Sequence, residues 1–187
     1  MGQRLSKIYT KTGDKKQTKT ATNQVLIKDH PKIILNGELD ELNSCLGLVR
    51  SFLQNDIALF DEILQTLQHQ LFDFGGEITL PTYPKITSKA IAYLEDNIDK
   101  INAKLPPLKE FILPGGNQCA SFCHLARAVA RRCERHLISL SRTEKLSEYL
   151  LIYINRLSDL LFVLARYLNV SANSQEIYWN SQKLLKG

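Results

Sequence analysis

From Gly37 onward, apolar residues recur at spacings of three and four, and no segment alternates as a half-buried strand would. The first such series contains Leu39, Leu42, Leu46 and Val49. Series of the same kind follow, and together they predict helices over about 38–49, 57–71, 90–101, 117–141 and 145–168. Because each helix carries one apolar face, we expect an all-α fold, a bundle of about five helices.

The segments between and around these helices divide the chain of 187 residues. Glycines and prolines predict a break over 75–84, and the tail at 173–186 has room for a short final helix. The first part of the chain is rich in Lys, Thr, Gln and Asn, which predicts an extended arm or irregular loop. We therefore expect one domain made of an N-terminal arm (1–37), a helical bundle (38–170) and a C-terminal tail (171–187).

The composition is that of a globular protein, with 44% hydrophobic and 23% charged residues. No run of 18 apolar residues predicts a membrane span, and the first residues have no apolar segment typical of a signal peptide. We therefore expect a cytoplasmic protein in a reducing compartment. The cysteines are Cys45, Cys119, Cys123 and Cys133, whose spacing matches neither a haem attachment nor a paired zinc motif. The cysteines are either small residues on helix faces or ligands of a metal site, and the first interpretation is favoured.

The formal net charge of +5 favours an anionic partner such as a phosphorylated ligand, a nucleic acid or a membrane surface. Positive charge gathers in the N-terminal arm and again in the predicted helix over 117–141. That helix lacks interleaved aromatic residues, and no helix-turn-helix or other known nucleic-acid-binding motif occurs, so we expect neither a nucleic-acid nor a membrane partner.

The arm contains the loop Thr10-Lys11-Thr12-Gly13-Asp14, followed by Thr18 and Lys28. Glycine permits close approach of the backbone to a ligand, while threonine hydroxyls and lysine ammonium groups suit phosphate oxygens. Neither a P-loop nor a Rossmann fingerprint is present, so nucleotide binding here needs a different device. The loop is therefore either a solvated turn or a phosphate-binding site, with Asp14 available to a phosphate-bound Mg²⁺.

A cationic face runs along the predicted helix over 117–141, because its polar residues fall three, four and seven positions apart. The residues on this face are His124, Arg127, Arg131, Glu134 and Arg135. The face is either solvated or turned toward a ligand. Buried arginines need carboxylate partners, and the candidates are Asp40, Glu41 and Asp159.

Two further positions have both a structural and a functional interpretation. Asn155 and Asp159 share a face of a mainly apolar helix, where they make either packing hydrogen bonds or ligand contacts. Phe111 precedes the turn Pro114-Gly-Gly116 and is either a core residue or part of a binding surface.

Five segments in this order resemble the PduO-type ATP:cob(I)alamin adenosyltransferases, also called corrinoid adenosyltransferases. They are Ile8-Tyr-Thr-Lys-Thr-Gly-Asp14, Gly37-Glu-Leu-Asp-Glu-Leu-Asn43, Phe111-Ile-Leu-Pro-Gly-Gly116, His124-Leu-Ala-Arg-Ala-Val-Ala-Arg-Arg-Cys-Glu-Arg135 and Tyr153-Ile-Asn-Arg-Leu-Ser-Asp-Leu-Leu-Phe162. The resemblance implies a five-helix bundle that assembles as a homotrimer with active sites between subunits. It also implies transfer of the 5′-deoxyadenosyl group of ATP to the cobalt of cob(I)alamin, with release of triphosphate.

The resemblance assigns roles to individual residues. The implied ATP-binding residues are Thr10, Lys11, Thr12, Gly13, Thr18, Lys28, Arg131, Arg132, Glu134, Arg135 and Asn155. Asp40 and Arg127 match an ion pair between subunits, Arg131 faces the leaving triphosphate, and Phe111 matches an aromatic residue that closes one face of the corrin. Mg²⁺ is expected with the ATP phosphates and without assigned protein ligands. A cobalamin reductase and an adenosylcobalamin-dependent enzyme are the further partners implied.

One departure concerns the arm, where Lys16 stands at a position that is usually glycine in this family. A lysine adopts a positive φ at greater cost than glycine, whereas Asn23 nearby tolerates one and can substitute for a second family glycine. This departure motivates an alternative function, a non-catalytic bundle that binds ATP or a corrinoid and stores or delivers the cofactor.

Overall fold

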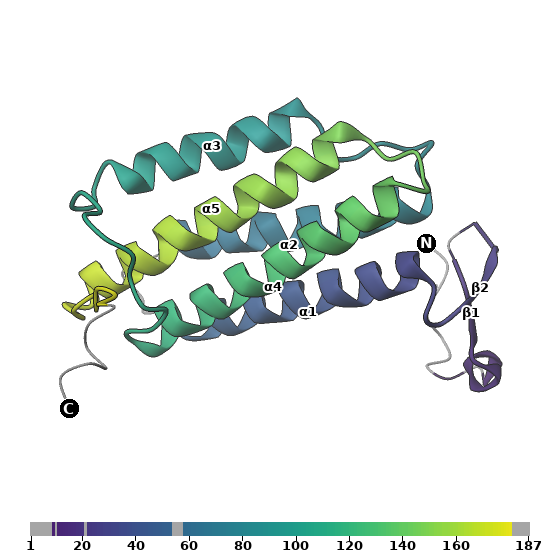
Figure 1. Ribbon diagram of the computed structural model, residues 1–187, viewed down its shortest axis with the longest axis horizontal. Coiled ribbons are helices and arrows are strands. Elements are labelled where there is room, and N and C mark those ends of the chain that lie inside the picture. The colour runs from purple at the N-terminus through teal and green to yellow at the C-terminus, as the bar shows by residue number, and fades with distance from the viewer. Residues whose placement is uncertain (1–8, 10, 21, 54–57, 181–187) are drawn as a thin grey trace.

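The computed structural model describes residues 9, 11–20, 22–53 and 58–180. Five long helices dominate the described chain, and the expected all-α bundle is confirmed (Figure 1). The helices are α1 (Pro31–Ser51), α2 (Ala58–Thr79), α3 (Ser88–Asn102), α4 (Gln118–Ser141) and α5 (Glu148–Ser171). None of these helices has both the length and the apolar character that crossing a membrane requires.

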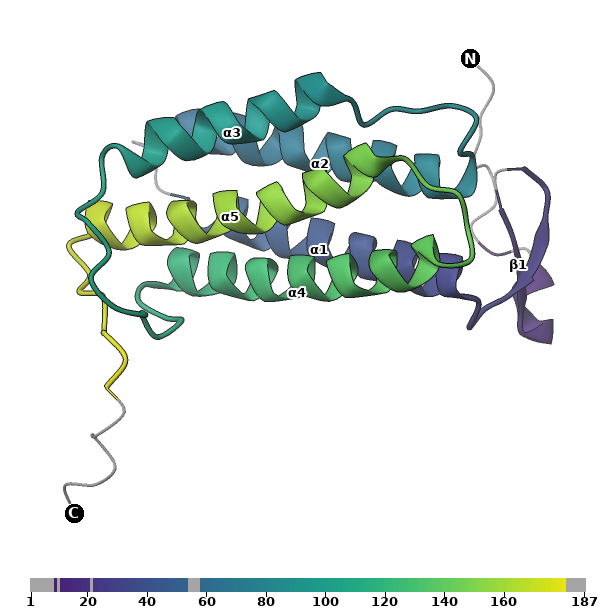
Figure 2. The same ribbon diagram turned by 45° about the horizontal axis from the view of Figure 1, so that its top comes forward.

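The helices bury the apolar series that predicted them. Helix α4 packs against α1 and α5, while α3 packs on α5 and α2 packs on α1 (Figure 2). Leu35, Leu42 and Leu46 of α1 are fully buried, as are Leu157 and Leu161 of α5. The core also contains the four cysteines, which are free and buried as small residues on helix faces.

Helix α1 begins at Pro31, so the expected boundary of the arm at residue 37 is wrong. His30 caps the helix, because its ring Nδ1 accepts a hydrogen bond of 3.2 Å from the backbone N–H of Lys32. Proline suits the first helical position, where its missing N–H has no partner to lose. Leu35 continues the buried series, but the surrounding lysines obscured it in the sequence.

The N-terminal arm is more ordered than the sequence predicted. It contains a short 3₁₀ helix, η1 (Thr12–Lys15), and an antiparallel pair of strands, β1 (Gln17–Lys19) and β2 (Val25–Ile27). The strands pack on each other and β1 packs on η1, while the arm extends beyond one end of the bundle (Figure 1).

The predicted break over 75–84 starts too early, because α2 continues through Gly75 and Gly76 to Thr79. Between α2 and α3 the chain leaves helical structure only over 80–87. The Asn36 side chain of α1 lies against Gly75, and a Cβ at this glycine would come within 2.6 Å of Asn36 Oδ1. Gly75 therefore serves the close approach of two helices and does not end one.

The tail contains no helix over the described residues 172–180, contrary to the sequence expectation, and residues 181–187 lie outside the described chain. Helix α5 ends at Ser171, and the tail then runs back along the connection between α3 and α4. A single antiparallel bridge pairs Ile112 with Tyr178. This connection and the tail lie at the end of the bundle opposite the arm (Figures 1 and 2).

Candidate functional site

Three arginines on α4 form a stripe of positive charge without carboxylate partners. We call Arg127, Arg131 and Arg135 the arginine stripe. They lie four residues apart and so share one face of the helix. Among the described residues, none of the three forms an ion pair, and Arg131 and Arg135 are exposed. A row of unpaired guanidinium groups is suited to an anion that carries several charges.

The N-terminal end of the stripe is half-buried and contains unsatisfied polar atoms. The Nε of Arg127 and both ring nitrogens of His124 are buried without a hydrogen-bond partner in the described part of the chain. Both side chains lie beside Phe162, with the Arg127 Cζ 5.8 Å from the ring centroid. Burial, reinforced by the charge of Arg127, lowers the pKa of His124 to about 4, so this imidazole is neutral at pH 7.

Arg132 lies off the stripe and turns toward α1. Its guanidinium pairs with Glu41 and, at 3.2 Å, with Glu38. The second Glu38 oxygen lies 2.7 Å from His136 Nδ1. Glu41, an expected partner of the stripe, pairs with Arg132 instead, so that expectation is wrong for Glu41. Glu38 and His136 were not predicted to take part. The only signal for them in the sequence was their place beside the apolar faces of two amphipathic helices.

Asn155 of α5 joins Glu134 of α4 beside the stripe. The Asn155 amide donates a hydrogen bond of 3.0 Å to Glu134 Oε1, and its carbonyl oxygen accepts one of 2.9 Å from Arg156. These two candidate ATP-binding residues therefore lie together. Asp159 is close by but forms no ion pair with any described residue, and burial raises its pKa.

In the arm, Gly13, which precedes β1, and Lys28, which follows β2, come together at the open end of the hairpin. A Cβ at Gly13 would lie 3.1 Å from the Lys28 ammonium nitrogen, so the absence of a side chain makes room for this cation. Both residues line a cavity of about 660 Å³, together with Asp14 and Lys16. Thr18 is half-buried on β1 opposite Leu26, and Lys11 is exposed. Thr10 and the side chain of Thr12 lie outside the described part of the structure.

Among the described residues of the arm, three that are not glycine have left-handed backbone. The φ angles are +60° at Lys11, +62° at Lys16 and +61° at Asn23. Lys16 and Asn23, the two positions where glycine is usual, therefore both have a positive φ. The Lys16 carbonyl also accepts a 3.0 Å hydrogen bond from the Lys28 N–H, so the strained residue supports the backbone beside the cavity.

Asp40 lies on the exposed face of α1, on a groove of about 580 Å³ between α1 and α2. Gly37, Gly75 and Gly76 leave this groove open. Asp40 makes no ion pair with Arg127 within the described subunit.

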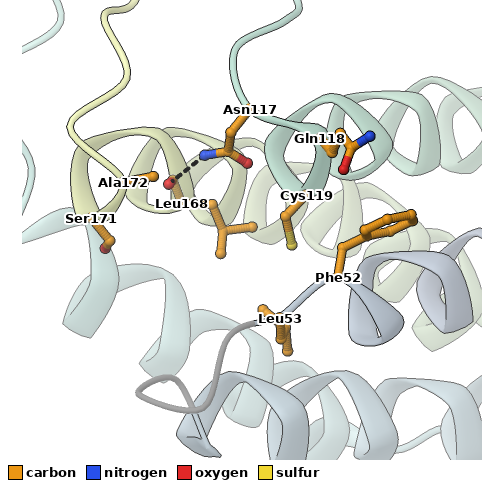
Figure 3. A pocket seen from close by; sticks show the side chains of 8 residues that line it. All are labelled: Phe52, Leu53, Asn117, Gln118, Cys119, Leu168, Ser171 and Ala172. Carbon is orange, nitrogen blue, oxygen red and sulfur yellow. Dashed lines mark hydrogen bonds between the residues drawn. The ribbon is translucent and has the colours of Figure 1, made fainter.

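Phe111 is not a core residue, because 75% of its surface is exposed. It lies at the same end of the bundle as a separate pocket of about 180 Å³ between the ends of α1, α4 and α5 (Figure 3). Phe52, Cys119 and Leu168 contribute walls of that pocket, and none of the predicted site residues lines it. No group of three or more His, Cys, Asp or Glu within the described ranges has the arrangement of a metal site.

A match over most of the chain identifies the family. The profile of the family described as cobalamin adenosyltransferase matches residues 8–168, most of the chain. The chain belongs to the cobalamin adenosyltransferase family.

Relatives of known name agree with this assignment. The chain is 43% identical to a cobalamin adenosyltransferase of Cupriavidus metallidurans over 98% of this chain and 99% of the relative. It is 40% identical to the corrinoid adenosyltransferase of Bacillus subtilis, covering 96% and 95% of the two chains. A solved variant of the PduO-type ATP:corrinoid adenosyltransferase from Lactobacillus reuteri, complexed with cobalamin and ATP, superposes with a TM-score of 0.87. That structure is 37% identical and covers 94% of this chain and 100% of its own.

Proposed function

We propose that this cobalamin adenosyltransferase homologue transfers the 5′-deoxyadenosyl group of ATP to the cobalt of cob(I)alamin and releases triphosphate. The observation that carries the proposal is the arginine stripe, a row of unpaired cations on a long helix of a chain that belongs to this family. Asn155 and Glu134 lie beside the stripe and offer neutral and acidic hydrogen-bond groups to the nucleoside.

The reaction needs alignment and charge stabilisation more than acid–base catalysis. Cobalt(I) is itself a strong nucleophile that attacks C5′ of ATP, forming a Co–C bond as the C5′–O bond to triphosphate breaks. The electron pair of that C–O bond leaves with the triphosphate, so no general base is required. The neutral His124 is consistent with this, because it has no carboxylate or hydroxyl partner in the described chain to form a proton relay. Arg131 and Arg135, with Lys11 and Lys28 of the arm, stabilise the negative charge that develops on the leaving group.

Phe111 acts on the corrin. Its exposed ring is available to close one face of the macrocycle, where it excludes the lower axial ligand. A four-coordinate cobalt(II) centre is easier to reduce to cobalt(I), so Phe111 favours formation of the nucleophile. Thr10, Thr12, Gly13, Thr18, Lys28 and Arg132 complete the proposed ATP-binding set.

We propose that sites form between subunits of a homotrimer. The arm and the Phe111 segment lie at opposite ends of the bundle (Figure 1), and the 24 residues of α4 between them span about 36 Å. A nucleotide held by the arm therefore cannot meet a corrin beside Phe111 of the same subunit. Asp40 at the α1–α2 groove and Arg127 both lack an ion-pair partner within the described subunit, which supports a pair between neighbours.

Mg²⁺ accompanies the ATP phosphates in this proposal. Mg²⁺ usually keeps most of its water and phosphate ligands and takes one or two carboxylates from the protein. Asp14 fits this requirement, since it lines the same cavity as Lys28. Bound there, the ion would offset phosphate charge and orient the leaving group. We also propose a cytoplasmic setting, with a cobalamin reductase upstream and an adenosylcobalamin-dependent enzyme downstream.

An anaerobic assay with chemically reduced cob(I)alamin, Mg²⁺ and ATP tests the function. Adenosylcobalamin and triphosphate should form in equal amounts. Failure of folded, ATP-binding protein to turn over would contradict the proposal and favour the storage or delivery alternative.

The assay also tests the stripe. Arg131→Ala should lower kcat about 100-fold or more, because one preorganised donor to a developing charge is lost. Arg142→Ala removes one exposed positive charge at the C-terminal end of α4, outside the stripe, and should leave kcat within about twofold. Equal effects of the two variants would show that general charge, and not the stripe, is what matters.

A further inference from the structure

The segment that presents Phe111 precedes α4, and hydrogen bonds hold the C-terminal end of this segment to α5. Asn169 donates a 2.9 Å hydrogen bond to the Gly115 carbonyl and accepts one of 3.1 Å from the Asn117 N–H. The Asn117 amide returns a 2.8 Å hydrogen bond to the Leu168 carbonyl (Figure 3). Gly116, at φ +114°, lies so close to Asn169 that a Cβ could not be accommodated. These contacts fix the end of the segment that enters α4.

The residues on either side of Ile112 are held by the C-terminal tail. The Trp179 N–H donates a 2.7 Å hydrogen bond to the Phe111 carbonyl, and the Leu113 N–H donates one of 2.8 Å to the Ile177 carbonyl. The bridge between Ile112 and Tyr178 lies between these two bonds. The backbone position of Phe111 itself therefore depends on the tail.

A buried ion pair holds the tail to the bundle. Arg166 of α5 binds both oxygens of Glu176, at 2.9 and 3.2 Å, and also donates a 3.0 Å hydrogen bond to the Pro106 carbonyl. The exposed fractions of the Arg166 and Glu176 side chains are 2% and 9%. A bidentate guanidinium–carboxylate pair this buried fixes geometry strongly. It connects α5, the start of the α3–α4 connection and the tail at one point.

We propose that residues 174–179 form a C-terminal strap that sets the position of Phe111 against the corrin, with Glu176 as a positioning residue. This inference rests on the proposed function. Because Phe111 is mostly exposed, little packing holds its ring, so the location of the ring depends mainly on the backbone. The strap restrains the backbone at residues 111–113, and Asn169 restrains it at Gly115 and Asn117. Glu176 touches no substrate and acts through the tail.

Paired variants separate the strap from a general structural role. Trp179→Pro removes the N–H that binds the Phe111 carbonyl, while Trp179→Ala removes only the side chain. Glu176→Gln keeps the shape of the carboxylate but not its charge. Gln175→Ala is the matched control, because Gln175 is exposed in the same segment and makes no hydrogen bond within the described chain. The readouts are the fraction of four-coordinate cob(II)alamin by electron paramagnetic resonance, kcat, and KM for ATP.

We expect Trp179→Pro and Glu176→Gln to lower both the four-coordinate fraction and kcat by about tenfold, since small misplacements of a reacting group are costly. KM for ATP should stay within about twofold. In Trp179→Ala and Gln175→Ala the four-coordinate fraction and kcat should fall much less. Unchanged four-coordinate fractions in Trp179→Pro and Glu176→Gln would overturn the strap, as would a parallel rise in KM for ATP. Absence of adenosylcobalamin formation by the unaltered protein would instead contradict the proposed function.

Discussion

Lys16 adopts a backbone conformation that glycine takes more easily. A left-handed conformation costs a non-glycine residue about 1–2 kcal/mol, and Lys16 has this conformation where η1 ends. Its carbonyl binds the Lys28 N–H, so the cavity of the arm keeps its backbone frame despite the substitution. At Lys16 the departure from the family pattern therefore has a conformational cost that glycine would not have.

Lys16→Gly should retain activity without raising KM for ATP. Glycine adopts the observed φ without steric cost, so the loop geometry is preserved while the lysine side chain is lost. Steady-state kinetics with varied ATP measure this. A large loss of activity would show that the Lys16 ammonium itself contacts the nucleotide.

His124 should make stability depend on pH. Its pKa is lowered by burial to about 4 in the folded protein and returns to about 6.5 on unfolding. Its contribution to stability is therefore complete above pH 6.5 and is lost as the pH falls toward 4. The slope reaches at most about 1.4 kcal/mol per pH unit for one proton.

Urea unfolding of the protein and of His124→Gln, measured from pH 7 to 4, tests this expectation. The difference in free energy of unfolding between the two should shrink as the pH falls, because only the original protein loses the histidine contribution. Arg127 lies next to this ring and keeps its charge throughout this range. Parallel pH profiles would contradict the assignment.

For single residues, the sequence indicated where charges lie along the chain better than the direction in which each side chain points. Arg131 and Arg132 are adjacent, yet successive residues point about 100° apart around a helix, so one faces outward and the other contacts Glu38 and Glu41. The sequence could not show which neighbour each would meet. Arg166 and Glu176 were missed because their pairing depends on how the tail folds back.

At the scale of elements, leucine periodicity predicted five helices, and glycines misled the prediction of where they end. Gly75 and Gly76 were interpreted as a helix break, although α2 passes through both. Glycine weakens an isolated helix, but here it permits contact with Asn36. Whether a glycine ends a helix or permits close helix packing depends on the neighbouring helix, and a single sequence does not show which helices are neighbours.

The two glycines should respond differently to alanine. Gly75→Ala would bring a Cβ against Asn36 Oδ1, and moving Asn36 would disturb its 3.0 Å hydrogen bond to the Lys32 carbonyl. We expect a loss of about 1 kcal/mol in the free energy of unfolding. At Gly76 the space is open, so Gly76→Ala should be neutral or stabilising by up to about 1 kcal/mol. Equal effects in chemical denaturation would refute the packing role of Gly75.

On the scale of the whole molecule, the separation of the arm from the Phe111 segment is the feature that local patterns could not predict. Sequence order alone does not tell which loops share an end of a bundle. The structure puts the arm at one end and the Phe111 segment at the other (Figure 2). The proposed reaction then requires more than one copy of the chain.

Mixed trimers test this requirement. Lys28→Ala damages only the arm and Phe111→Ala only the opposite end, so each parent should have low activity. In trimers co-assembled from equal amounts, about a quarter of sites between subunits combine an intact arm with an intact Phe111 segment. Activity should recover toward that fraction. Recovery no greater than the mean of the parents would indicate that each site uses a single chain.

The arm is also the part of the described protein that we expect to be lost first by proteolysis. A two-stranded hairpin is at best marginally stable by itself, and the main contacts of β1 and β2 in the described arm are with each other and, for β1, with η1. Its amides should therefore exchange with solvent far sooner than those of the bundle. A protease that cuts after lysine would remove the arm while the helices stay folded. Such a clipped protein would keep its helical spectrum and its melting transition while losing the nucleotide, so folding assays alone would not detect the damage.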